Sequence, residues 1–441
     1  MGKPRSAPVA KEGSVPYALI AAILLGAGII LIPVIYASGV VETFRAPKEL
    51  AFRAEAILLA LTGVFAATSP RASWRKAMAA LPRREWYLLA AIGIWSVVTT
   101  VTSTNRPLSQ ASLITVAAAM VIYIATRLVA PSLGLPVLFV VFIGALINAV
   151  VVTLQELRIW NPFVFPADVT DHLQSVGLLG NSNDVGTVLA GPAVVALVAA
   201  VALRGWPRAL YGSAGAILFA GIFMSRTRTA MVAFAAGMIV AALLRPRKQA
   251  LSVGALLIVC ALVALRPSTG IGQYFRQLIP AARNRDYPTL FSERLVPFLS
   301  AIEMVRGHPV TGVGPGCFKY QFMMIRLSLE QRYPPQWTRG WPMNFGETHN
   351  DHLQVAAETG LPGYALFAAA ILLLAVPSRR AQRLLETATT ERHRVARAVR
   401  TPLAATFLVV AIAQFPLQIA APRLMFLLLA AVSVSWDHDD G

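Results

Sequence analysis

Arginines in two separate stretches of the chain have the side chain that an anion-binding site needs. Arg226 and Arg228 stand between two apolar segments, and Arg294 follows in a long polar stretch. Because a guanidinium group matches phosphate oxygens bidentately, these arginines predict a phosphate-bearing ligand. Snorkelling at a helix end is the alternative for Arg226 and Arg228, and it needs no ligand.

The segment ETHNDH at residues 347–352 contains the candidate general base. An imidazole takes a proton near neutral pH, and the i, i+3 spacing of His349 and His352 predicts a shared helical face. Glu347, Asp351 and Glu358 are candidates for orienting the imidazole. Zinc binding is the competing interpretation, but the spacing is not HExxH and no other nearby cluster completes a metal site. An ordinary hydrogen-bonded histidine is the third interpretation.

A third segment, residues 177–186 (GLLGNSNDVG), is rich in glycine and amides and precedes an apolar run. Asn181 and Asn183 predict a helix cap there, and their amides could also hold a sugar or a phosphate. The chain has no Walker motif, dinucleotide fingerprint or nucleophile elbow. We therefore expect no cofactor, and the energy for a reaction must come from an activated substrate.

The elements that position these residues must lie in a membrane. Of 441 residues, 56% are hydrophobic and 14% charged, whereas soluble domains have about 25% charged residues. This composition predicts an all-α polytopic membrane protein with about 12 transmembrane helices, a single membrane domain over residues 1–441. The predicted spans are 16–41, 49–68, 86–102, 108–130, 135–156, 184–203, 209–225, 228–244, 250–265, 360–376, 402–420 and 423–436.

The positive charge follows these spans. A formal net charge of +18 would suggest a nucleic-acid partner in a soluble protein, but here Lys and Arg fall between apolar segments. The pattern predicts cytoplasmic termini, no nucleic-acid partner, and these basic residues on the cytoplasmic side: Arg71, Arg75, Lys76, Arg83, Arg84, Arg204, Arg208, Arg245, Arg247, Lys248, Arg379, Arg380, Arg383, Arg392, Arg394, Arg397 and Arg400.

A long polar loop, residues 266–359, is predicted on the periplasmic side between the ninth and tenth spans. Residues 267–350 contain nine Lys or Arg and five acids. Orientation in the membrane does not require this excess, which suggests an anionic ligand or lipid headgroups at the outer surface. Apolar stripes at 293–305 (Leu295, Phe298, Leu299, Ile302 and Val305) and at 320–329 predict helices lying over the membrane face.

Four blocks of the sequence, in this order, resemble the O-antigen ligase and O-antigen polymerase superfamily, whose members move glycans from undecaprenyl diphosphate. The blocks are Gly180-Asn181-Ser182-Asn183; Thr227-Arg228-Thr229-Ala230-Met231; Glu293-Arg294 through the segment 308–318; and Thr348-His349-Asn350 through Leu353, Glu358, Gly360, Pro362 and Gly363. They cover about residues 177–364. The N-terminal spans have no motif of their own, so the likeness there depends on topology.

The resemblance implies that Arg228 and Arg294 bind the diphosphate and that His349 is the catalytic base. The further substrate-binding candidates are Arg226, Asn181, Asn183, Asn350, Glu347, Asp351 and Glu358. Arg226 stands outside the strict motif. The reaction implied is metal-independent and inverts the anomeric centre.

The resemblance also implies a location and partners: the bacterial inner membrane, with the active site facing the periplasm, membrane lipids, and an undecaprenyl-diphosphate-linked glycan as donor. An O-antigen ligase with lipid A-core as acceptor is the first expectation. A polymerase with a glycan acceptor is the alternative within the family. A lipid or solute transporter or flippase is the alternative from another class, although its sites should lie near midplane in two related halves.

Overall fold

The computed structural model describes residues 17–68, 81–133, 135–164, 175–245, 251, 254, 266, 270–338, 345–376 and 391–435, and every regular element in them is a helix. The predicted all-α fold is therefore confirmed. The long helices are α1 (Tyr17–Val34), α2 (Arg45–Thr68), α4 (Arg83–Val101), α5 (Arg106–Leu133), α6 (Leu135–Glu156), α7 (Ser182–Ala202), α8 (Gly205–Met224), α9 (Arg228–Leu243), α16 (Asp351–Ala375), α18 (Glu391–Ala413) and α19 (Ala420–Ser435).

Most of these helices have the length and composition of membrane spans. Within the described residues, eight are long and apolar enough to cross a bilayer, and α9 and α19 are shorter apolar helices. The predicted span 86–102 falls on α4, while 250–265 lies outside the described residues apart from Leu251 and Gly254. Large apolar side chains such as Ile23, Ile57 and Leu372 are exposed on the perimeter, as lipid contact requires.

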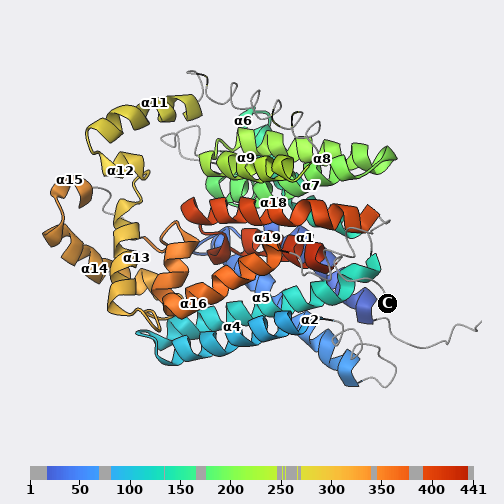
Figure 1. Cartoon of the computed structure of the whole chain (residues 1–441), viewed down its shortest axis with the longest axis horizontal. Helices are drawn as coiled ribbons and strands as arrows, with labels where there is room; N and C mark the ends of the chain where they lie inside the picture. The colour runs from blue at the N-terminus through green and yellow to red at the C-terminus, as the bar shows by residue number, and fades with distance from the viewer. Residues whose placement is uncertain are drawn as a thin grey trace, which may run out of the picture.

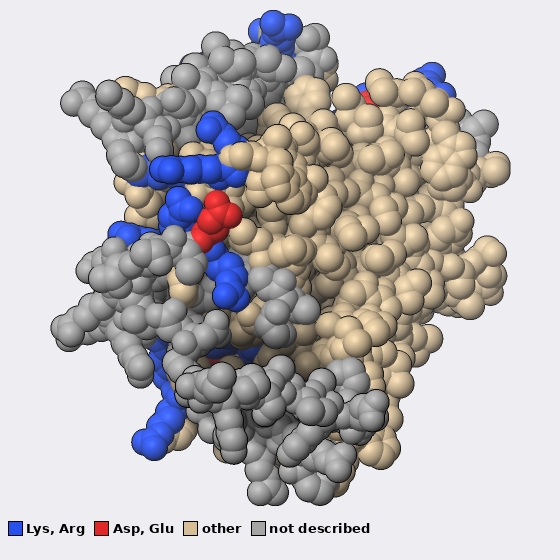
Figure 2. All heavy atoms as spheres, turned by 90° about the vertical axis from the view of Figure 1, so that its right-hand side faces the viewer, with Lys and Arg blue, Asp and Glu red and all other residues tan. Residues whose placement is uncertain are grey.

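The helices of the polar loop lie at one end of this bundle, on the left in Figure 1. They are α11 (Gly270–Arg283), α12 (Tyr287–Leu290), α13 (Leu295–Gly307), α14 (Phe318–Arg332) and α15 (Pro335–Thr338). We call this end of the bundle the loop end. Figure 2 looks onto the opposite end, where Lys and Arg side chains form a band with few acids among them. This distribution agrees with the charge pattern that the sequence predicts.

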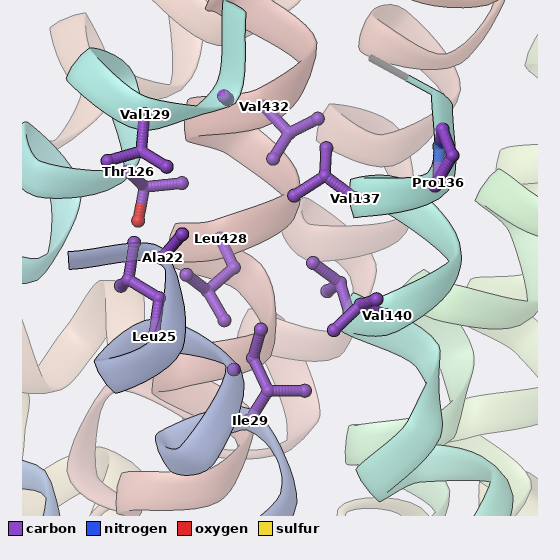
Figure 3. A pocket seen from close by; sticks show the side chains of 13 residues that line it. Ala22, Leu25, Ile29, Thr126, Val129, Pro136, Val137, Val140, Leu428 and Val432 are labelled. Atoms are coloured by element: carbon purple, nitrogen blue, oxygen red, sulfur yellow. The ribbon is translucent and has the colours of Figure 1, made fainter. Parts of the chain in front are cut away.

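Near that opposite end, an apolar cavity of about 200 Å³ lies between α1, α5, α6 and α19. Figure 3 shows side chains such as Leu25, Val140 and Leu428 around it, and none of the predicted site residues lines it. With Thr126 as its polar exception, this cavity has no groups for proton transfer or phosphate binding. The candidate chemistry therefore belongs to the loop end.

The inner end of α18 corrects one prediction. The span predicted at 402–420 begins earlier and ends sooner, because residues 391–401, predicted as loop, are helical and α18 ends at Ala413. Arg400 is buried, and its Nε and Nη2 donate to the carbonyls of Leu374 and Leu373 at 2.9 and 2.6 Å. The guanidinium of Arg400 thus donates to carbonyls in the last turn of α16. These hydrogen bonds favour helix over loop for residues 391–401.

The helix predicted at 293–305 is present as α13, and its most buried face is not the apolar stripe. The buried residues are Pro297, Ser300, Ala301 and Met304, whereas the predicted apolar stripe is half-buried. Small side chains at 300 and 301 permit close packing on α14 and α16. Close approach of small residues, rather than apolar area, therefore sets this face.

Residues 309–314 of the loop contact α16 at a break in this helix and form backbone hydrogen bonds there. Gly360 interrupts this helix with a φ of 70°, and a Cβ there would lie 2.0 Å from the Val310 carbonyl oxygen. The amides of Val313 and Gly314 donate to the carbonyls of Ala357 and Glu358 at 2.9 and 3.0 Å. Only glycine permits both this backbone angle and this approach. The break therefore fixes α13 and α14 relative to the start of α16.

Candidate active site

His349 lies just before α16 in a left-handed backbone conformation, with a φ of 57°. Asn350 caps the helix, because its side chain accepts from the Leu353 amide at 3.0 Å. The imidazole ring packs edge-on against Phe345 and Phe415, with centroid distances of 5.9 and 4.6 Å. Its Nδ1 is buried with no hydrogen-bond partner among the described residues. The imidazole ring therefore lies between two aromatic rings at the loop end.

This environment keeps the imidazole neutral. Burial, and then the positive charges of Arg294 and Arg45, lower the pKa of His349 to about 3. A neutral imidazole is the form that can accept a proton.

The lowered pKa predicts how stability changes with pH. The unfolded chain takes up this proton below about pH 6.5, whereas the folded state resists it down to about pH 3. The free energy of unfolding should therefore fall as the pH is lowered from 6.5, and His349→Asn should abolish this contribution. Thermal unfolding of both proteins in detergent between pH 8 and 4.5 measures it. A difference in Tm that stays constant over this range would contradict the prediction.

Arg294 and Arg228 approach each other from different elements. Arg294 precedes α13, and Arg228 is the first residue of α9, with its guanidinium carbon 3.8 Å from the ring centroid of Tyr274. The Tyr274 hydroxyl lies 3.0 Å from Ser292 Oγ. Burial and the nearby charge of Arg228 lower the pKa of Arg294 to about 10. Like charges that approach in this way favour binding of an anion between them.

The corner between α18 and η2 (Pro416–Gln418) joins the arginines to the histidine. Arg294 Nη1 donates to the carbonyl of Ala413, the last residue of α18. Phe415, two residues later, packs on His349 and also lies under the guanidinium of Arg45, 5.4 Å from its centroid. Arg45, Tyr274 and Phe415 were not among the residues predicted from the sequence.

Two charged side chains hold this corner through the main chain of Leu417. The Leu417 amide donates to Asp351 Oδ2 at 2.9 Å, and Arg423 Nε donates to the Leu417 carbonyl at 2.7 Å. Arg423 Nη1 also pairs with Glu49 Oε2 at 3.1 Å. Asp351 is therefore occupied by the corner and makes no hydrogen bond to the imidazole of His349.

Glu358, another candidate for orienting His349, binds the loop instead. Its carboxylate accepts from the amides of Gly316 and Phe318 at 2.8 and 3.2 Å, and from Gln354 Nε2 at 3.2 Å. Glu347, the remaining candidate, lies 3.3 Å from Arg45 Nη1. Burial raises the pKa of Glu347, against the effect of Arg45. Within the described part of the chain, none of the three acids forms a hydrogen bond to His349 Nδ1.

Glu358→Ala should destabilise the protein, because it leaves buried amides of residues 316 and 318 without acceptors. We expect a loss of about 2 kcal/mol or more in the free energy of unfolding. Denaturant or thermal unfolding in detergent measures this loss. Glu330→Ala is the control, since the Arg326–Glu330 pair is partly exposed and should contribute under about 1 kcal/mol. Equal stability of the two variants would show that Glu358 does not hold the loop.

Arg226, Asn181 and Asn183 make local contacts at the starts of α7 and α9. Arg226 Nε donates to Glu156 Oε1 at 2.8 Å, and its side chain is 56% exposed. The Asn181 side chain caps α7 by accepting from the Asn183 amide at 2.8 Å. Thr227 in turn donates to the Ser182 carbonyl at 2.7 Å, which holds the start of α9 against the start of α7.

His349 and His352 do not share a helical face. The helix begins at Asp351, so His349 lies outside it in a left-handed conformation, and the i, i+3 relation does not apply. The His352 ring instead contacts Tyr364 and Phe367, with centroid distances of 6.0 and 5.5 Å. The predicted shared face was therefore wrong, and the two imidazoles do not form a pair.

A comparison with protein-family models matches residues 213–368 to the family described as O-antigen ligase. The match begins in α8, includes α9 and the loop helices, and ends in α16. Arg228, Arg294 and His349 all lie within it, while Arg45 and Phe415 lie outside it. Among curated proteins, the comparison found no match.

Proposed function

We propose that the protein is a metal-independent, inverting membrane glycosyltransferase of the O-antigen ligase type. It moves a glycan from undecaprenyl diphosphate to a hydroxyl of lipid A-core. The match of residues 213–368 to the O-antigen ligase family supports this proposal. The observation that carries the proposal is the approach of Arg228, Arg294 and His349, from three separate segments, at the loop end of an apolar bundle.

In this proposal the arginines bind the donor diphosphate. Arg228 is exposed and is held over the Tyr274 ring, and Arg294 lies close enough to feel its charge. Two guanidinium groups offset the negative charge that develops on the leaving diphosphate in the transition state. Arg226, whose side chain pairs with Glu156, is not assigned this role.

His349 acts as the base toward the acceptor. The imidazole takes the proton of the acceptor hydroxyl, the hydroxyl oxygen forms a bond to the anomeric carbon, and the bond from that carbon to the diphosphate oxygen breaks. Undecaprenyl diphosphate leaves with the electron pair, and direct displacement inverts the anomeric centre. Because Arg294 lowers the pKa of His349, a bound diphosphate that offsets its charge raises that pKa. The base therefore becomes stronger when the donor is present.

We also propose that the loop end faces the periplasm of the bacterial inner membrane and that both termini are cytoplasmic. The band of Lys and Arg at the opposite end (Figure 2) supports this orientation through the positive-inside rule. The donor glycan would then reach the site from the outer leaflet.

Reconstitution in liposomes tests the proposed function. Purified protein is supplied with an undecaprenyl-diphosphate-linked glycan and lipid A-core, and the products are separated by mass. A new glycosidic bond to lipid A-core supports the ligase. Linkage of two donor glycans would identify a polymerase instead, and movement of the intact donor across the bilayer without a new bond would identify a transporter.

A further inference from the structure

Arg45 forms a second charged group beside His349, with two carboxylates. Arg45 Nη1 lies 3.3 Å from Glu347 Oε1, and Arg45 Nη2 lies 3.8 Å from Asp184 Oδ2. The three residues come from the start of α2, the start of α7 and the segment before α16. The side chains of Arg45 and Glu347 are 35% and 25% exposed, whereas that of Asp184 is 3% exposed. A ligand can therefore contact Arg45 and Glu347, with Asp184 behind them.

Phe415 connects this group to His349, because its ring contacts the imidazole and lies under the guanidinium of Arg45. The charges that act on Arg294 include Arg228, and those that act on His349 include both Arg294 and Arg45. Arg294 reaches the same corner through another residue, because its Nη1 donates to the carbonyl of Ala413. Arg294 and Arg45 therefore meet the corner beside His349 at different residues, Ala413 and Phe415.

The charge of this group differs from that of the arginine pair. Two carboxylates flank the guanidinium of Arg45, so a diphosphate placed here would meet two acids. An ionised carboxylate accepts hydrogen bonds and a guanidinium donates them. Hydrogen-bond acceptors and donors side by side suit a ligand whose groups both donate and accept hydrogen bonds. A sugar hydroxyl is such a group.

Apolar surface continues from this group along the loop end. The rings of Tyr36, Phe44 and Phe163 pack with centroid distances of 5.0 to 5.9 Å, and Tyr36 is 41% exposed. Phe44 adjoins Arg45 in sequence. Its ring also packs on Gly180, where a Cβ would lie 2.2 Å from the ring. Gly180 stands four residues before Asp184. Aromatic faces of this kind can pack against the apolar face of a sugar ring.

We propose that Arg45 and Glu347 form the subsite for the acceptor sugar, with Asp184 as the residue that positions Arg45. Arg45 and Glu347 hydrogen-bond acceptor hydroxyls next to the one that His349 deprotonates. This inference rests on the proposed function and extends it, because it separates an acceptor side of the site from a donor side. The acceptor sugar then lies between His349 and the aromatic rings of Tyr36 and Phe44.

Glu347→Gln and Arg45→Lys test the subsite by steady-state kinetics of the purified protein. Lipid A-core is the acceptor, and an undecaprenyl-diphosphate-linked glycan is the donor. We expect the KM for lipid A-core to rise about tenfold or more, the loss typical of one hydrogen bond to a charged group. The KM for the donor and the Kd of undecaprenyl diphosphate should stay within about twofold of wild type. Glu303→Gln, which changes an acid that pairs with Arg306 and Arg332, is the matched control.

Two outcomes overturn the inference. A higher KM for the donor, or weaker binding of undecaprenyl diphosphate, would assign Arg45 to the donor side. Unchanged constants in both variants would show a purely structural cluster. If Arg45→Lys lowers the Tm and so loses folding, the KM values of Glu347→Gln decide between the outcomes. Failure of the proposed function is distinct, since the wild-type protein itself would form no glycosidic bond.

Discussion

Arg294→Ala is expected to lower the rate of glycan transfer about a hundred- to a thousandfold, the range seen when one donor to a developing negative charge is removed. The guanidinium is half-buried and donates to the Ala413 carbonyl, so water replaces it poorly. Arg294→Lys should also be strongly impaired, because an ammonium group lacks the bidentate fork. The measurement is the initial rate of product formation with saturating lipid A-core and a range of donor concentrations.

Arg306→Ala is the matched control for Arg294→Ala. Arg306 is on the last turn of the same helix, α13, and its side chain is 64% exposed. This variant should keep the wild-type rate within about twofold. Because Arg294 also donates to the Ala413 carbonyl, both variants are checked for wild-type Tm in detergent. Wild-type activity of a folded Arg294→Ala protein would remove the proposed role in diphosphate binding.

His349→Asn is expected to lower the transfer rate about a hundred- to ten-thousandfold, the contribution typical of a general base. Asparagine tolerates the left-handed backbone at this position, so the substitution removes the base with little backbone strain. His349→Gly tolerates it too, and it leaves a space between Phe345 and Phe415. Added imidazole should restore part of the rate of this glycine variant.

Rescue by imidazole separates a base from a structural residue, because a residue that only packs would not regain activity in this way. The control is His352→Asn, whose ring contacts Tyr364 and Phe367 away from the site. It should retain the wild-type rate within a few-fold. An active His349→Asn protein, or equal losses at 349 and 352, would contradict the assignment of the base.

The sequence predicted the fold class from composition, and this prediction is confirmed, whereas the orientation in the membrane stays a prediction. Apolar runs of span length leave the backbone no alternative to helix in a membrane, so this part depends on local information. The end of α18 was predicted less well. Whether a run of arginines is loop or helix depends on the carbonyls it meets, as Arg400 meets those of Leu373 and Leu374.

The candidate site was predicted in part. Arg228, Arg294 and His349 lie in short motifs, whereas Phe415 and Tyr274 are ordinary aromatic residues whose neighbours are distant in sequence. Arg45 had a readable signal, because it is a cation in a short connection where orientation in the membrane requires none. The acids near His349 could not be ranked, since Asp351 and Glu358 accept from backbone amides at residues 417, 316 and 318.

The corner between α18 and η2 contacts residues from three distant segments and holds them in place. Arg294 donates to the Ala413 carbonyl at the end of α18, and the ring of Phe415 contacts that of His349. Asp351 accepts from the Leu417 amide, and Arg423 donates to the Leu417 carbonyl. A substitution that shifts this corner, even without contacting a glycan, would move His349 and the diphosphate-binding Arg294 together. Efforts to change which glycan is accepted should therefore alter the rim around Tyr36 and leave Ala413 to Leu417 intact.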